Sequence, residues 1–236
     1  MAVHEPLLFQ PAFLAHGNTQ LPEIALTFDD GPAPGYTLAV LRLLRRYHIQ
    51  ATFFMLGAWV QRYPDLARAV IADGHAVGNH TWDHPYLTKL NADRVLQQLA
   101  STLDMIEQVT AVRTTLFRPP YGYYNRRTLD VADSLRLSAI LWNVDPVDWL
   151  RPGSKTIITD VLSHTHNGSI ILLHDGGGSR EQTLQALPVI IEQLQARGFK
   201  FVTIPQMMAH PKSASMPRLL RAPLPDRVFR WLVRML

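Results

Sequence analysis

The chain has 236 residues, of which 47% are hydrophobic and 18% charged, a globular composition that excludes disordered, collagen-like and coiled-coil proteins. It contains no cysteine and no run of 18 apolar residues, which excludes disulfides, thiolate metal sites and a transmembrane helix in this sequence. Its net charge of +4 arises from residues 206–236, where six basic side chains accompany one acid, so the rest of the chain lacks the basic excess of a nucleic-acid-binding protein.

The amino-terminal residues lack the features of a secretory signal peptide. Residues 1–17 contain neither a basic start nor a long apolar stretch. We therefore expect a cytoplasmic protein, or a secreted or envelope protein if a leader precedes this sequence.

Short apolar runs alternate with amphipathic segments along the chain. The runs are rich in Val, Ile, Phe and Leu, which predicts strands over residues 23–28, 51–56, 75–79, 116–118, 138–144, 169–173 and 199–204. The segments between them predict helices over residues 37–47, 65–72, 91–109, 126–135, 156–163 and 181–196. Asn91 is suited to cap the start of the long third helix.

Seven strands that alternate with helices predict an α/β fold in which right-handed crossovers join parallel strands. The length of this pattern favours an incomplete β/α barrel over an open sheet. We divide the chain into an N-terminal segment of residues 1–22, a catalytic domain of residues 23–206 and a tail of residues 207–236, in which proline and arginine dominate.

Polar residues follow five of the predicted strands at the same end. They are Asp29 and Asp30, His80 and His84, Arg118, Asp145 and Asp148, and His174 and Asp175. The carboxyl ends of parallel strands form the rim on which β/α barrels and sheets build their active sites. The sequence therefore predicts an active site at this rim.

The first two groups have the chemistry of a metal site. Successive residues of a strand point to opposite sides, so we expect one of Asp29 and Asp30 to bind a metal while the other faces a substrate water. His80 and His84 have a spacing that lets two imidazoles converge, and two imidazoles with one carboxylate suit a divalent metal. A simple Asp-Gly-Pro turn is the alternative interpretation of the aspartate pair.

The residues after the later strands include candidates for proton transfer and for stabilisation of charge. Two prolines fix the backbone after Arg118, so the backbone N–H of Tyr121 is a candidate oxyanion donor and Arg118 a candidate partner for a carboxylate base. His174, if Asp148 contacts it, is a candidate general acid in its charged form. A rigid surface loop and a hydrogen-bonded core histidine are the alternatives.

Five segments occur in the order and form of the motifs of one family: residues 27–32, 80–84, 118–122, 145–149 and 172–175. The chain resembles the polysaccharide deacetylases of carbohydrate esterase family 4, the NodB homology domain, over about residues 22–205. These enzymes include chitin, chitooligosaccharide and peptidoglycan N-deacetylases. The resemblance implies a distorted (β/α)7 barrel that hydrolyses acetamides on sugars with the help of a metal.

The resemblance also implies roles for individual residues. Asp30, His80 and His84 would bind the divalent metal, usually zinc, with cobalt or another divalent ion as alternatives. Asp29 would be the general base that deprotonates water, and His174 the general acid that protonates the leaving amine.

Further residues would support this chemistry. The resemblance implies that Arg118 holds Asp29, that Asp148 holds His174, and that the backbone of Tyr121 binds the oxyanion. The residues expected to line the substrate pocket are Pro120, Tyr121, Trp149 and Leu172.

The expected substrates are N-acetylglucosamine-containing glycans of the chitin, chitooligosaccharide or peptidoglycan type. An O-acetyl glycan esterase and a deacylase of a lipid-linked amino sugar are alternatives. A catalytically inactive carbohydrate-binding domain is disfavoured, because neither Asp29 nor a histidine of the expected metal site is missing.

The lipid-linked alternative rests on the tail. Four apolar residues there follow helical spacing beside arginines: Val228, Trp231, Leu232 and Met235. A basic amphipathic helix of this kind is suited to contact an anionic membrane surface. Packing of the same apolar stripe on the barrel is the other interpretation, and the one we favour.

Overall fold

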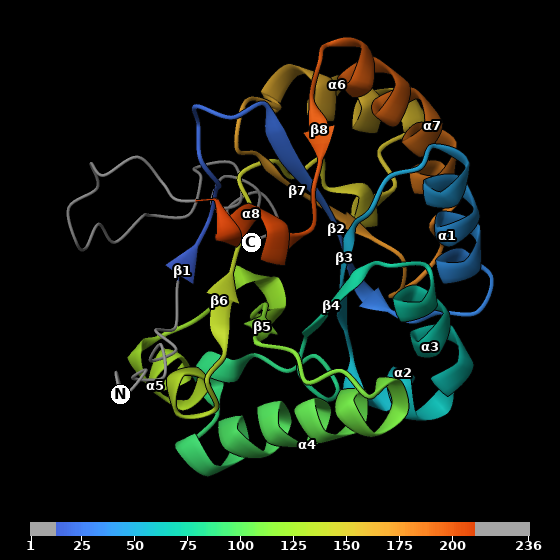
Figure 1. Ribbon diagram of the computed structural model, residues 1–236. Coiled ribbons are helices and arrows are strands. Elements are labelled where there is room, and N and C mark those ends of the chain that lie inside the picture. Colours follow the sequence, from blue (N-terminus) through green and yellow to red (C-terminus); the bar gives the residue numbers. More distant parts are fainter. Residues whose placement is uncertain (1–12, 211–236) are drawn as a thin grey trace, which may run out of the picture.

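Parallel strands form the centre of the protein, as the continuous apolar runs predict. The structure, a computed structural model, describes residues 13–210 (Figure 1). Its strands are β1 (Phe13–Leu14), β2 (Glu23–Gly31), β3 (Thr52–Met55), β4 (Ala76–Asn79), β5 (Leu116–Phe117), β6 (Ser138–Ile140), β7 (Ile170–His174) and β8 (Lys200–Phe201). Their order is β1-β6-β5-β4-β3-β2-β7, and β8 pairs with β2.

A backbone bridge between Val144, which follows β6, and Ile171 of β7 connects the β6 side of this series to its β7 end. The strand predicted over residues 138–144 ends at Ile140 in the structure. Val144, the last residue of the predicted range, pairs with β7 instead. There the Leu172 amide donates to the Val144 carbonyl over 2.9 Å. The strands thus form a distorted barrel, and the predicted α/β class is confirmed.

Helices surround the strands on the outside (Figure 1). They are α1 (Tyr36–Arg46), α2 (Gly57–Arg62), α3 (Pro64–Ala72), α4 (Ala92–Thr110), α5 (Arg126–Ser134), α6 (Ser154–His164), α7 (Glu181–Ala196) and α8 (Ile204–Ala209). Three short 3-10 turns also occur: η1 (Leu87–Lys89), η2 (Pro120–Gly122) and η3 (Asp148–Leu150). The side chain of Asn91 caps α4 as predicted, since it accepts a hydrogen bond from the Arg94 amide.

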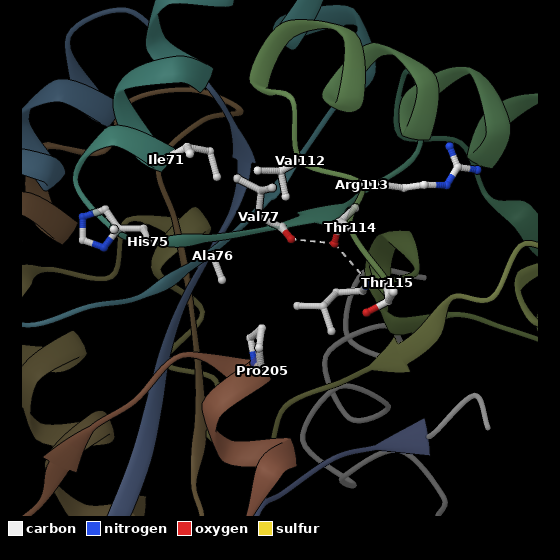
Figure 2. A pocket seen from close by; sticks show the side chains of 11 residues that line it. Ile71, His75, Ala76, Val77, Val112, Arg113, Thr114, Thr115 and Pro205 are labelled. Carbon is white, nitrogen blue, oxygen red and sulfur yellow. Dashed lines mark hydrogen bonds between the residues drawn. The ribbon is translucent and has the colours of Figure 1, made fainter. Parts of the chain in front are cut away.

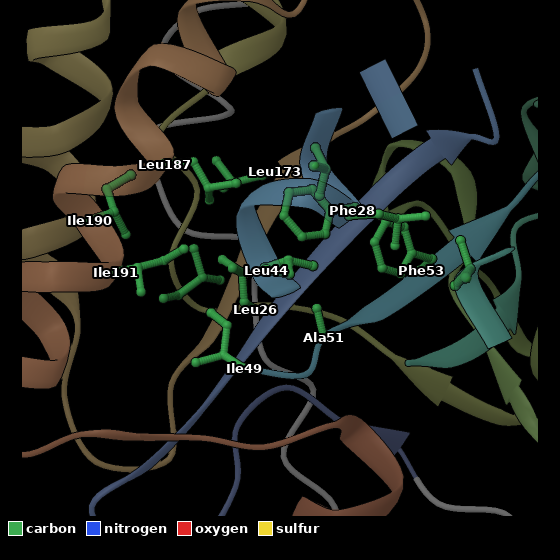
Figure 3. Close-up of a cluster of buried hydrophobic side chains, with 14 of the residues drawn as sticks. Leu26, Phe28, Leu44, Ile49, Ala51, Phe53, Leu173, Leu187, Ile190 and Ile191 are labelled. Carbon is green, nitrogen blue, oxygen red and sulfur yellow. The ribbon is translucent and has the colours of Figure 1, made fainter. Parts of the chain in front are cut away.

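A core of aliphatic and aromatic side chains joins the strands to the outer helices. Figure 3 shows this cluster, with Phe28 of β2 and Phe53 of β3 on one side and Leu187 and Ile190 of α7 on the other. Each of these side chains is at most 1% exposed. Burial of one such side chain contributes about 1.5–3 kcal/mol, so this core fixes the strands whose ends carry the polar residues.

Besides the 3-10 turns, three short elements were not predicted, namely β1, α2 and α8. The predicted strand 199–204 is wrong at its end, because α8 begins at Ile204. Thr203 and Gln206 form a capping box there, which fixes the start of a helix instead of continuing a strand. β1 lies before residue 23 and α8 extends to Ala209, so both reach past the limits drawn for the catalytic domain.

The predicted tail helix and its apolar stripe lie outside the described residues. Within residues 13–210, no helix combines the length and apolar character needed to cross a bilayer.

Candidate active site

The carboxyl ends of β2, β4, β5 and β7 bring the predicted polar residues together. Asp29 and Asp30 lie at the end of β2, and His174 is the last residue of β7. His80 directly follows β4, and Arg118 directly follows β5. Residues up to 145 positions apart in sequence therefore share one site, because parallel strands end at the same rim.

Asp29 and Asp30 do not point to opposite sides, contrary to our expectation. The pairing of β2 with β3 shifts between Asp29 and Gly31, and Asp30 takes a left-handed backbone with φ 71°. Such a bulge inserts one extra residue and interrupts the alternation of side chains. Both carboxylates consequently approach His80 Nε2, at 3.7 Å from Asp29 Oδ2 and 3.5 Å from Asp30 Oδ1.

Within residues 13–210, Asp30, His80 and His84 form a cluster suited to hold a metal. Their ligand atoms all lie within 4.8 Å of one another, and His84 Nε2 is 3.4 Å from Asp30 Oδ1. Asp30 Oδ1 is buried and has no hydrogen-bond partner among the described residues. One carboxylate and two imidazoles with open positions left for water fit a divalent ion such as zinc.

His80 is held in the form that a metal ligand needs. Its Nδ1 lies 2.8 Å from the Arg118 carbonyl oxygen, so Nδ1–H donates there and Nε2 offers its lone pair to the cluster. Burial lowers the pKa of His80 to about 3, although the carboxylate of Asp30 acts in the opposite direction. The imidazole is therefore neutral at pH 7.

Arg118 is fully buried and holds Asp29. Its Nη1 donates to Asp29 Oδ1 over 2.7 Å and to Thr27 Oγ1 over 2.8 Å. The guanidinium lies 4.1 Å from the centre of the Phe54 ring. Burial raises the pKa of Asp29, while the charge and hydrogen bond of Arg118 oppose that shift. Asp29 thus has a fixed orientation and a carboxyl group whose proton affinity is increased.

His174 is held by Asp148 in a second charged pair. Nδ1–H of His174 donates to Asp148 Oδ1 over 2.6 Å, and the His174 amide donates to Asp148 Oδ2 over 3.0 Å. Burial alone would lower the pKa of His174, but the Asp148 carboxylate raises it to about 9. The pKa of Asp148 is lowered, since His174 outweighs the effect of burial. His174 is therefore a charged imidazolium at neutral pH.

The residues expected around the substrate lie at the same rim or in the adjoining strand. Tyr121 has φ 59° in η2, between the buried residues Pro120 and Gly122, and is 43% exposed. Trp149 is 42% exposed on η3, whereas Leu172 is buried in β7. Contact of these groups with an acetylated sugar stays a prediction.

Two residues at the site were missed in the sequence. Thr183 of α7 donates its hydroxyl to Asp148 Oδ2 over 2.7 Å, 35 residues away, so no local pattern indicates it. Tyr86 stacks on Tyr121 with 4.1 Å between ring centres, and Tyr121 in turn lies 4.4 Å from the His84 ring. Tyr86 lies two residues after His84, and this proximity in sequence was the only indication that Tyr86 belongs to the site.

A hollow of about 320 Å³ lies elsewhere, near the amino ends of β4 and β5. Figure 2 shows His75, Thr114 and Pro205 around it. It shares no residue with the Asp30, His80 and His84 cluster, because it lies at the opposite end of these strands.

Comparisons with known proteins agree with this geometry. The family described as polysaccharide deacetylase matches residues 16–140. A peptidoglycan-N-acetylglucosamine deacetylase of Bacillus cereus is 40% identical over 189 residues, which cover 79% of this chain and 88% of that protein.

Two further relatives extend the comparison. A chitooligosaccharide deacetylase of Azorhizobium caulinodans is also 40% identical, over 77% of this chain and 92% of that one. A crystal structure of a peptidoglycan N-acetylglucosamine deacetylase is similar with a TM-score of 0.82 and 35% identity, over 86% of this chain and 95% of the other.

Proposed function

Because the chain belongs to the polysaccharide deacetylase family, we propose that it is a metal-dependent hydrolase that removes N-acetyl groups from N-acetylglucosamine-containing glycans. One observation carries the proposal. The buried pairs Asp29–Arg118 and His174–Asp148 lie beside the Asp30, His80 and His84 cluster, an arrangement that would provide a base, an acid and a metal site at one rim.

The cluster of Asp30, His80 and His84 would hold the divalent ion, with zinc as the first candidate and cobalt as an alternative. When bound, such an ion supplies Lewis acidity that lowers the pKa of water toward ~7. The neutral state of His80 and the unpartnered Oδ1 of Asp30 support this assignment.

Asp29 would act as the general base and His174 as the general acid. Asp29 accepts a proton from the water that attacks the acetamide carbon. His174 then donates its proton to the nitrogen as the C–N bond breaks, which releases acetate and the free amine. Arg118 orients the base, and Asp148 keeps the acid protonated.

The tetrahedral oxyanion requires a fixed hydrogen-bond donor, and we assign this role to the backbone N–H of Tyr121. The rigid, left-handed conformation of Tyr121 after Pro119 and Pro120 supports the assignment. Pro120, Trp149, Leu172 and the Tyr121 ring would line the pocket of the acetylated sugar.

A peptidoglycan deacetylase and a chitooligosaccharide deacetylase are both 40% identical to the chain, so sequence identity to these two relatives does not choose between their substrates. Acetate and free amine should therefore be measured with acetylated chitooligosaccharides, peptidoglycan fragments and O-acetylated glycans. We expect equal release of acetate and amine, loss of both after chelation, and recovery with zinc or cobalt. Acetate without amine would favour the O-acetyl esterase instead, and full turnover by verified metal-free protein would overturn the metal assignment.

Membrane contact through residues 227–236 and the cellular compartment stay separate predictions. Binding of the intact chain and of a chain lacking residues 217–236 to anionic vesicles tests the first, and cell fractionation tests the second.

A further inference from the structure

Asp175 is a buried carboxyl group that the proposed reaction does not use. It directly follows His174, is 1% exposed, and donates its backbone N–H to the Asp29 carbonyl oxygen over 3.1 Å. Its Oδ2 accepts the hydroxyl proton of Thr37 over 2.6 Å. Its Oδ1 is buried and has no hydrogen-bond partner among residues 13–210. Burial of a carboxyl oxygen without a hydrogen bond costs free energy, so the position of Asp175 calls for an explanation.

The Asp175 carboxyl packs directly against the backbone that carries Asp29 and Asp30. A β-carbon on Gly31 would lie 2.5 Å from both oxygens of Asp175, so any side chain at residue 31 would force the Asp175 carboxyl group to move. On the same side, a β-carbon on Gly177 would lie 2.5 Å from Asp30 Oδ2. The segment after β7 therefore fills the space behind the bulge of β2.

Hydrogen bonds fix both sides of this contact. Thr37 at the start of α1 accepts from the Ala33 amide over 2.7 Å while it donates to Asp175. Arg180, which is 4% exposed, donates to the carbonyl oxygens of Gly176 and Gly177 over 2.6 and 2.9 Å. Buried side chains thus hold both the start of α1 and the segment after β7, which lie near Asp30.

Asp30 has φ 71°, a conformation that a non-glycine residue keeps only where its surroundings impose it. We propose that Asp175 is a positioning residue: tied to Thr37, its carboxyl group holds the bulge of β2 in the conformation that aims Asp30 at His80 and His84. This inference rests on the proposed metal site and adds Asp175 and Thr37 to it.

The test measures zinc affinity of the metal-free, folded chain by equilibrium dialysis. We expect Asp175→Ala to weaken zinc binding about 10- to 100-fold, the usual effect of losing a group behind a metal ligand. Asp175→Asn should keep the affinity of the unmodified chain, because it retains the size and one oxygen acceptor for Thr37. Unchanged affinity in Asp175→Ala, or an equal loss in Asp175→Asn, would overturn the proposal.

A second variant keeps the test decisive if Asp175→Ala does not fold. Thr37→Val removes the hydroxyl that holds Asp175 and should also weaken zinc binding. Thr114→Val is its matched control. Thr114 is also buried, and its hydroxyl donates to the Val77 carbonyl oxygen at the other end of the barrel, away from Asp175. A merely structural role would lower the melting temperature of both valine variants and leave zinc affinity unchanged.

Asp30→Ala separates failure of this inference from failure of the proposed function. If Asp30→Ala abolishes zinc binding while Asp175→Ala and Thr37→Val do not weaken it, only the positioning role is wrong. If Asp30→Ala also binds zinc normally, the metal site itself is wrong, and the inference falls with it.

Discussion

Asp29 and His174 are register partners across the parallel strands β2 and β7. Residues paired in this way lie side by side on neighbouring strands, and their side chains leave the same face of the sheet. The spacing of the candidate base and the candidate acid is therefore set by backbone hydrogen bonds and not by a mobile loop. Substitution of either side chain should alter its proton transfer and leave the strand pairing intact.

Substitution of Asp29 should affect turnover, whereas substitution of Asp30 should affect metal binding. Asp29→Asn should lower kcat by about 10²–10⁴, the usual cost of losing a general base, and should keep the metal. Asp30→Asn should weaken metal binding itself. Turnover and zinc content of both purified variants check this, and an empty metal site in Asp29→Asn with a full one in Asp30→Asn would reverse the roles.

Asp148→Asn should move the basic limb of the pH–activity profile to lower pH. Asp148 raises the pKa of His174 to about 9, so the acid stays protonated well above neutrality. Without that carboxylate the pKa should fall below about 9, because only the charges of Asp30 and Asp29 then oppose the effect of burial. Asp160→Asn is the control, since Asp160 forms a similar pair with His164 on the surface of α6.

The pair of His174 and Asp148 should also make the free energy of unfolding depend on pH. The pKa of His174 is higher in the folded chain than the usual 6.5, so its contribution to the free energy of unfolding is complete below pH 6.5 and is lost as the pH rises through about 9. The melting temperature should fall across this interval. In Asp148→Asn the fall should become smaller and move to lower pH, because the carboxylate that raises the pKa of His174 most is absent. An identical profile in both proteins would contradict the pairing.

Arg118→Met should destabilise the fold strongly. It leaves the carboxylate of Asp29 buried without its partner, which typically costs about 3–5 kcal/mol of unfolding free energy. Arg113→Met provides the contrast, because the exposed Arg113–Glu107 pair should contribute only about 0–1 kcal/mol. Urea unfolding of both variants measures the difference, and equal losses would show that Arg118 does not stabilise Asp29.

Tyr86→Ala should lower kcat more than it raises KM. Tyr86 stacks on Tyr121, whose left-handed backbone we expect to donate to the oxyanion. An aromatic pair contributes about 0.5–1.5 kcal/mol beyond its buried area, which corresponds to a loss of up to about tenfold in rate. Tyr86→Phe keeps the ring and should restore kcat, whereas a change confined to KM would assign Tyr86 to substrate binding alone.

The sequence by itself determined the α/β class, most helices and the residue types that gather at the candidate site. These features leave local signals, such as the apolar run of β2, the Asn91 cap of α4 and polar residues directly after strands. A capping box at Thr203 was also present and would have corrected the end of the last predicted strand. Short elements such as β1, with two residues, carry too little pattern to predict.

Tertiary structure decided how these residues meet. Arg118 contacts Asp29 across 89 positions and Thr37 contacts Asp175 across 138, distances in sequence over which no local pattern extends. The bulge that turns Asp30 toward His80 depends on the pairing of β2 with β3 and on the packing behind it. Residue types follow from sequence because side-chain chemistry is local, whereas the geometry of the site follows from strand order, register and close packing, which only the folded chain fixes.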